Sequence, residues 1–374
     1  MKKTLPIIAL TCATSFSASA EVRINGFANL IGGITSSDDT VYGYDDRFSF
    51  SDESLFAIQV SGDINEKMTA TGQIVARGNE DYEAEFEWAY LTYQATDNFA
   101  VSAGRLRLPL FRYSASSDVG YSYHWVSAPR SVYDVGFNNV DGLRLDYSDY
   151  AGDWEYNLQG VVGSYASDFL GGRLTGDNLY LFSAEVTYEW FKMRGVYGAN
   201  KSTYSRSDLD MTIRALADAG LSNLASDLAL EDDTGTFLGF GAEIDTFDYF
   251  VSAEITVTEN EESYSPEATA FYVTAGMRMG KFTPSITYEK FEEDDEIKFL
   301  DQVAALPAEV QPLAGAVVTG LQQSIINEYN VVTLGLRYDM DTNVALKADI
   351  SKYNDDLNDA ADATLVRFAV NYVF

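Results

Sequence analysis

The segment Ala363-Thr-Leu-Val-Arg-Phe-Ala-Val-Asn-Tyr-Val-Phe374 ends the chain and alternates between two kinds of side chain. Successive side chains of a β-strand point to opposite faces. One face would carry Val366, Phe368, Val370, Tyr372 and Phe374. The other would carry Leu365, Arg367, Ala369 and Asn371. The pattern predicts a strand with an apolar face and a face that can meet water, and it ends on an aromatic residue.

The first twenty residues have the three parts of a secretory signal peptide. Lys2 and Lys3 precede a largely apolar stretch at 5–14, and Ala18-Ser19-Ala20 fits a cleavage site. That stretch is well short of the ~20 residues that a membrane-spanning helix needs. We therefore expect residues 1–20 to be a cleaved signal peptide and residues 21–374 to form one domain. Cys12, the single cysteine, lies in the predicted signal peptide, so the mature chain would have no disulfide.

The composition is strongly acidic and rich in aromatic residues. The precursor has 25 basic and 57 acidic side chains, a formal net charge of −32, and loss of Lys2 and Lys3 would make it −34. Such a charge argues against nucleic acid as a partner. With 25 Tyr and 22 Phe, the chain is too aromatic for a disordered acidic protein. No stretch after residue 20 suits a spanning helix, so a membrane form would have to be a closed barrel.

Sixteen segments alternate with period two and are bounded by turn residues. In 84–95, for example, Phe86, Trp88 and Tyr90 oppose Glu85 and Glu87. The predicted strands are 22–34, 55–64, 68–77, 84–95, 98–106, 138–147, 153–164, 179–190, 192–200, 236–245, 248–258, 268–279, 281–290, 328–339, 343–353 and 363–374.

The connections between these segments alternate in length. Seven short turns alternate with eight mostly longer loops, as sixteen strands require if both termini face the periplasm. A soluble β-sandwich also alternates along its strands, but it usually lacks this asymmetry of its connections. The sequence therefore predicts an all-β fold: a transmembrane antiparallel barrel of sixteen strands with long extracellular loops.

Two of the longer loops are helix-like. Apolar residues recur at near-helical spacing in 207–230, and 297–326 is rich in Ala, Leu and Val. We interpret both as a packed cap over neighbouring loops. Contact with another subunit, or a gate, is the alternative interpretation.

In these features the chain resembles the sixteen-stranded general porins of Gram-negative bacteria. The resemblance rests on the signal peptide, the strand count, the terminal Phe374 and a long third loop after Gly104-Arg105-Leu106-Arg107-Leu108-Pro109. It implies a third loop folded into the lumen, a homotrimer among outer-membrane lipid and lipopolysaccharide, and recognition of the C-terminal strand by the barrel-insertion machinery. It also implies passive diffusion of small hydrophilic solutes and ions, without catalysis, cofactor or metal. The acidic Pro-Glu-Phe-Gly-Gly type sequence of enteric porins is absent from the third loop.

Charged residues on the polar face of each strand should line the lumen, because an Arg or Lys near the middle of the membrane costs ~2–4 kcal/mol on the lipid side. Structural pairing explains most of these charges in a wide, wet pore. The predicted lumen residues are Arg23, Arg77, Glu85, Glu87, Arg144, Asp146, Arg278, Arg337, Lys347 and Arg367.

Selectivity should depend on the charges at the narrowest point, where low-dielectric walls focus the field. We place Arg105, Arg107, Arg112 and Arg130 on one side of this constriction, and Asp118 and Asp134 on the other. For any one of them, pinning the third loop to the wall is an equally good interpretation. An acidic mouth would favour cations and an arginine constriction would favour anions, so we predict weak selectivity of undetermined sign.

Two other functions are compatible with the sequence. Tyrosines of the third loop could form a binding track in a channel selective for an anionic or sugar-like solute: Tyr113, Tyr121, Tyr123 and Tyr133. An outer-membrane enzyme could use His124, the sole histidine, near Ser122 and Asp118. Isolated loop histidines are usually surface residues, so we predict no enzyme activity.

Overall fold

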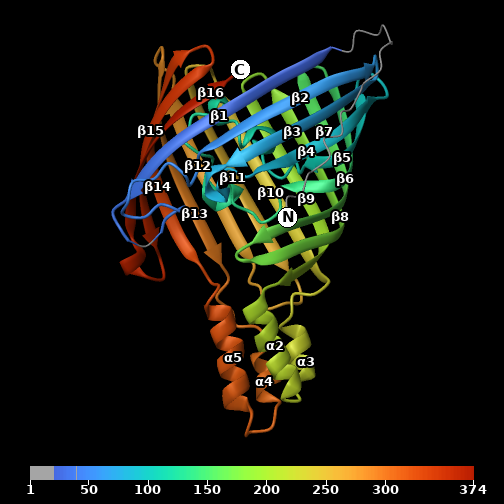
Figure 1. The fold of residues 1–374 in the computed structure, drawn as a ribbon, viewed down its shortest axis with the longest axis vertical. Coiled ribbons are helices and arrows are strands. Elements are labelled where there is room, and N and C mark those ends of the chain that lie inside the picture. Colours follow the sequence, from blue (N-terminus) through green and yellow to red (C-terminus); the bar gives the residue numbers. More distant parts are fainter. Residues whose placement is uncertain (1–20, 39) are drawn as a thin grey trace, which may run out of the picture.

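The computed structural model describes residues 21–38 and 40–374, so the predicted signal peptide lies outside the described residues. Sixteen strands form one closed barrel, in which each strand pairs antiparallel with its sequence neighbours and β16 closes against β1 (Figure 1). The strands are β1 (Val22–Thr35), β2 (Leu55–Asn65), β3 (Met68–Arg77), β4 (Ala84–Gln94), β5 (Phe99–Arg107), β6 (Asn139–Ala151), β7 (Trp154–Phe169), β8 (Gly172–Tyr188), β9 (Phe191–Ser205), β10 (Asp233–Asp245), β11 (Tyr249–Asn260), β12 (Ala268–Met277), β13 (Phe282–Glu293), β14 (Glu328–Asp341), β15 (Val344–Asp355) and β16 (Ala363–Val373).

The predicted sixteen-stranded antiparallel barrel is confirmed. One connection differs: 165–178 was predicted to be a loop, but β7 and β8 continue through it and meet at Leu170 and Gly171. Both turn residues have positive φ, of 46° and 74°, as a tight hairpin turn requires. Gly176 has no Cβ where the Tyr165 ring lies, so the two strands can pair closely there. The prediction failed because glycines and polar residues interrupt the alternation.

Side chains of the terminal strand alternate as predicted. Phe368 and Phe374 are 46% and 47% exposed on the outer surface, whereas Arg367 and Asn371 on the inner face are 4% and 0% exposed. Outward Val, Leu, Ile, Phe and Tyr recur on the other strands, including Phe182, Leu238, Ile286 and Leu334. The barrel therefore has an apolar exterior and keeps its charged strand residues inside or at its rims.

Four helices form a projection beyond the loop side of the barrel (Figure 1). They are α2 (Ser207–Asp218), α3 (Ser222–Asp227), α4 (Leu300–Ala304) and α5 (Gln311–Gln323). A shared core of Leu209, Leu224, Leu228, Val303 and Val318 joins the two loops, so they pack on each other, but they project from the rim where a cap over neighbouring loops was expected (Figure 1). We call these four helices the helical extension. Among the described residues, no helix combines the length and apolarity needed to cross a membrane.

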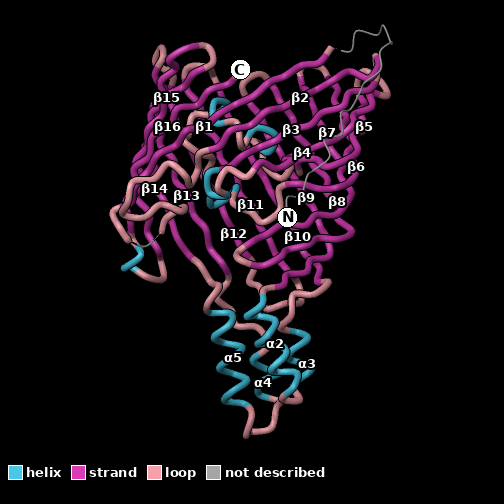
Figure 2. Tube along the Cα trace, viewed as in Figure 1, coloured by secondary structure: helices cyan, strands magenta, loops and turns pink. Residues whose placement is uncertain are grey.

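The other helical turns are short. Figure 2 shows three of them within the barrel outline: η2 (Ser114–Ser116), η3 (Gly120–Ser122) and α1 (Arg130–Tyr133). All three belong to the segment between β5 and β6, which we call loop 3 (residues 108–138). The remaining two are η1 (Gly78–Glu80) and η4 (Asp359–Ala361), in loops at the rim.

Candidate functional site in the barrel interior

Loop 3 crosses the barrel interior and is attached first by apolar contacts. Leu108, Leu110 and Phe111 are at most 3% exposed and share a core with inward residues of the wall, among them Val161 and Phe237. At ~25 cal/mol per Å² of buried apolar surface, such a cluster stabilises the inward position by several kcal/mol. Loop 3 therefore excludes water from the inward strand faces on which it packs.

Three inward cations of the wall, of which Arg194 and Lys347 are buried, hold the main chain of loop 3. Arg194 of β9 donates to the carbonyl oxygens of Pro109 and Leu110. Arg337 of β14 donates to those of Tyr121 and Tyr123 at 2.7 and 2.8 Å. Lys347 of β15 donates to those of Gly120 and Trp125. Buried carbonyls and buried cations satisfy one another in this arrangement, which fixes the path of the loop.

Carboxylates of the strands between β9 and β14 receive donors from the loop. Glu254 of β11 accepts the main-chain N–H of Arg112 at 2.9 Å and the hydroxyl of Tyr133 at 2.8 Å. Glu289 of β13 accepts the N–H and the hydroxyl of Ser131 at 3.2 and 3.0 Å. Together with the three cations, these contacts attach loop 3 to β9, β11, β13, β14 and β15.

Arg367 of β16 lies in a buried ion-pair cluster below loop 3. Its guanidinium is 2.7 Å from Asp349 and 3.0 Å from Glu53, and it donates to the Ser127 hydroxyl at 2.7 Å. Arg337, Lys347 and Arg367 thus face inward, as predicted, but they are covered instead of lining an open lumen. The sequence argument assumed a wet inner face along each whole strand, and loop 3 removes that water.

Two chambers remain on the two sides of loop 3. The outer chamber has a volume of about 850 Å³ and lies toward the loop rim, between β1–β8 and the segment 42–54 that precedes β2. The inner chamber, of about 280 Å³, lies toward the terminal rim against β6, β7, β8 and β9. Arg107, Phe111 and Ser114 line both chambers, so they stand between the two.

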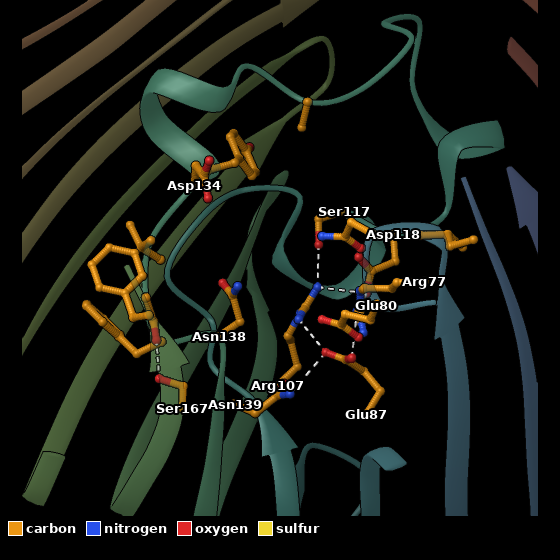
Figure 3. Close-up of a pocket in the computed structure, with 18 of the residues that line it drawn as sticks. Arg77, Glu80, Glu87, Arg107, Ser117, Asp118, Asp134, Asn138, Asn139 and Ser167 are labelled. Atoms are coloured by element: carbon orange, nitrogen blue, oxygen red, sulfur yellow. Dashed lines mark hydrogen bonds and ion pairs between the residues drawn. The ribbon is translucent and has the colours of Figure 1, made fainter. Parts of the chain in front are cut away.

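A four-residue charge network borders the outer chamber at this junction (Figure 3). Arg107 contacts Glu87 at 2.7 Å and Asp118 at 3.0 Å, and it also donates to the Ser117 hydroxyl. Arg77 contacts Glu87 at 2.6 Å and Asp118 at 3.3 Å. Two cations and two anions alternate in direct contact, and a third anion, Glu85, lies 3.2 Å from Arg77.

The constriction residues predicted from sequence are dispersed, and only Arg107 lines both chambers. Arg105 forms a paired contact with Asp141 at 3.0 Å in the outer chamber, and Arg112 reaches Glu243 at 2.6 Å beside the inner chamber. Arg130 and Asp134 pair with each other at 2.5 Å on one helical turn.

These pairings correct the predicted arrangement of the constriction. Arginines and aspartates do not stand on opposite sides of a gap; Arg107 with Asp118, and Arg130 with Asp134, are in contact. Figure 3 shows Asp134 apart from Arg107, on the other side of the chamber.

The remaining predicted lumen residues divide between the chambers and the terminal rim. Arg77, Glu85 and Glu87 line the outer chamber, and the Arg144–Asp146 pair, at 2.9 Å, lines the inner one. At the terminal rim, Arg23 pairs with Asp63 at 2.8 Å and Arg278 with Asp245 at 2.6 Å; neither arginine lines a chamber.

Sequence reasoning missed Arg194, Phe111 and Ser114. Arg194 follows Met193 in β9, so the two side chains point to opposite faces of the strand. The same argument from strand faces would have placed Arg194 inside the barrel. Phe111 and Ser114 belong to an irregular loop, where no periodicity indicates which side chains border a cavity.

His124 has the surroundings of a packing residue. Its Nε2 lies 3.2 Å from the Thr274 hydroxyl, and its ring packs against Trp125 and Phe250 at 4.1 and 4.5 Å. Burial, with Lys347 and other nearby cations, holds the pKa of His124 well below its usual value. Ser122 donates to the Ser116 carbonyl instead. Within residues 21–38 and 40–374, no group of three or more His, Cys, Asp and Glu is arranged to hold a metal ion.

Several solved structures share this fold. The outer membrane channel DcaP of Acinetobacter baumannii matches with a TM-score of 0.61 and 11% identity, over 96% of this chain and 99% of that one. OmpF of Salmonella typhi, in a complex with daunomycin, matches with a TM-score of 0.59 and 13% identity, over 95% and 98%. The trimer form of OmpT of Vibrio cholerae gives 0.54 and 10%, over 94% and 99%.

Sequence comparison gives the family. No curated protein is similar enough to count as a match. The family model described as Gram-negative porin matches residues 7–374, nearly the whole chain. With a closed barrel, an apolar exterior and a loop-filled interior, this protein belongs to the Gram-negative porin family of non-enzymatic outer-membrane channels.

Proposed function

We propose that this porin conducts small hydrophilic solutes and ions passively along a path beside loop 3. The path enters the outer chamber, passes Arg107, Phe111 and Ser114, and leaves through the inner chamber. The observation that carries the proposal is that these three residues line both chambers. Since loop 3 covers much of β9–β16, the path is narrow and follows the β3–β9 side.

The two chambers differ in charge, which bears on ion preference. Nine acidic residues and five arginines line the outer chamber, whereas four arginines and two acidic residues line the inner one. The outer chamber should concentrate cations and the inner one anions, so their effects oppose each other. Weak net selectivity is the expected result, as the sequence suggested.

We also infer how the protein is targeted to the outer membrane and assembled there. Cleavage after Ala20 would release a mature chain of residues 21–374, whose terminal strand would be read by the insertion machinery through Phe374. Both termini would face the periplasm, and lipid with lipopolysaccharide would surround the apolar exterior. The trimer form of the OmpT neighbour supports a homotrimer.

Planar-bilayer recording with the purified, folded protein tests the proposed path. We expect discrete channels, inserting in groups of three, and a changed conductance when Arg107→Gln removes a contact shared by both chambers. The matched control is Arg23→Gln, which alters an arginine at the terminal rim and should leave conductance unchanged. Absence of channels from folded protein, or equal effects of the two substitutions, would contradict the proposal.

A channel selective for an anionic solute is the second candidate. The excess of arginine in the small inner chamber favours it. The predicted tyrosine track does not: Tyr113 and Tyr121 line neither chamber, and only Tyr123 and Tyr133 border the outer one. A saturable block by one class of solute would distinguish this candidate from a general diffusion channel.

A further inference from the structure

We propose that the inner chamber is a binding subsite for the carboxylate group of a small solute, with Arg112 and Arg194 as its principal cations. The inference rests on the proposed channel function and adds the chemical class of solute that the channel retains.

Arg112 is the first reason. Its side chain is 4% exposed and lines the inner chamber, and its single ion pair runs from Nη2 to Glu243 at 2.6 Å. The other two guanidinium nitrogens, Nε and Nη1, have no hydrogen-bond partner in the part of the chain that the structure describes. A buried charged donor without an acceptor costs about 1–3 kcal/mol or more, so an entering acceptor would relieve a real penalty.

Arg194 is the second reason. It is 6% exposed, lines the same chamber, and forms no ion pair with a carboxylate among the described residues. Its donors go to the carbonyls of Pro109 and Leu110, which supply no negative charge. The chamber's two acidic residues are occupied elsewhere, because Asp146 pairs with Arg144 and Glu185 lies 3.7 Å from Lys192. Within the described residues Arg194 therefore has no carboxylate in direct contact, and Glu254 and Glu185 attract it from farther away.

The chamber's size and other lining residues define the solute. Its 280 Å³ corresponds to roughly nine water molecules at ~30 Å³ each, enough for an acid of a few carbon atoms. A carboxylate oxygen can accept a charge-assisted hydrogen bond from a guanidinium N–H, which is stronger than a hydrogen bond between neutral groups. Asn157, Gln159 and Ser183 line the same chamber and can bond to a polar remainder of the solute.

Single-channel recording in symmetric sodium chloride tests this with sodium propionate as the probe. Propionate should reduce the open-channel current saturably. Propylammonium chloride, a cation of similar size, should not. Inorganic phosphate is the comparison anion, because guanidinium groups bind phosphate as well as carboxylate and the two probes show which of them the subsite prefers.

Arg112→Gln alone would leave Glu243 buried without its partner, so the informative variant is Arg112→Gln with Glu243→Gln. We expect open channels whose dissociation constant for propionate rises at least tenfold, while Arg23→Gln leaves this constant unchanged. Arg144→Gln is a second variant, which leaves the bonds from Arg194 to the Pro109 and Leu110 carbonyls in place. It should weaken the block by propionate less than the double variant does.

Channels that propionate does not block, or that propionate and propylammonium block equally, would overturn the subsite while leaving the channel function intact. Stronger block by phosphate would overturn the carboxylate assignment. Unchanged propionate affinity in the Arg112/Glu243 double variant would also contradict it. Complete absence of channels would instead count against the proposed function itself.

Discussion

Replacing Lys347 by Met should loosen loop 3 without opening the barrel. The Lys347 Nζ is buried, donates to the carbonyls of Gly120 and Trp125, and lies 4.6 Å from the centre of the Tyr123 ring. Methionine has a similar length but no donor, so both carbonyls would lose their partner in a dry site.

The magnitude follows from these contacts. Two buried carbonyl oxygens left without a hydrogen bond cost about 1–3 kcal/mol each, and the lost cation–π contact costs ~0.5–2 kcal/mol. Part of this cost is offset, because methionine carries no charge that has to be removed from water. A net loss of about 3 kcal/mol would raise the fraction of molecules with loop 3 detached by roughly 150-fold.

Two measurements check this. Single-channel records of Lys347→Met should show brief increases in conductance that the unchanged protein lacks, and added protease should cut within 108–138 faster. Lys352→Met is the matched control, because Lys352 is on the same strand, is 51% exposed and contacts only Asp362, at 3.8 Å. Equal conductance noise and equal cleavage rates for Lys347→Met and the unchanged protein would refute the anchoring role.

Three further perturbations have definite expected results. Because the folded-state pKa of His124 is depressed, the unfolded chain takes up its proton first as pH falls below about 6.5, so stability should fall by up to ~1.4 kcal/mol per pH unit; His124→Asn should lack this part of the acid dependence in unfolding curves. Gly104→Ala should cost about 1–3 kcal/mol in thermal unfolding, because φ is +136° and a Cβ would lie 2.3 Å from the Ala89 carbonyl oxygen, whereas Gly195→Ala, whose Cβ meets no atom within 4 Å, should cost little. Leu228→Ala should lower the stability of the helical extension by ~2–5 kcal/mol and speed its proteolysis, while the unfolding midpoint of the barrel stays fixed. Leu313 is exposed, so Leu313→Ala is the control. Equal effects of the two substitutions in both assays would contradict a separate core.

The barrel could be predicted from sequence because the alternation of apolar and polar side chains is visible within each strand. Each strand shows its own alternation, and residues such as Phe368 and Arg367 reveal their faces without knowledge of any partner. The β7–β8 hairpin was shortened in the prediction because Gly171, Gly172 and Gly176 carry no side chain to alternate, although they are what allows the strands to continue.

The interior could not be predicted in the same way, because its contacts are distant in sequence. Arg194 meets Leu110 across 84 residues, and Lys347 meets Gly120 across 227. An inward charge looks the same in sequence whether it lines water or holds a loop. The Arg130–Asp134 pair is an exception, since a spacing of four residues after Pro129 was compatible with one helical turn and with mutual pairing.

The anchoring of loop 3 also constrains the order in which this molecule can assemble. The cations that bind its carbonyls come from β9, β14 and β15, and the Ser127 hydroxyl accepts from Arg367 of β16, the last strand to be synthesised. Loop-closure entropy makes such long-range contacts late ones in folding. The apolar partners of Leu108 and Leu110 come from earlier strands, but the contacts of residues 120–127 wait for β14, β15 and β16, which makes complete seating of loop 3 a late step of barrel maturation.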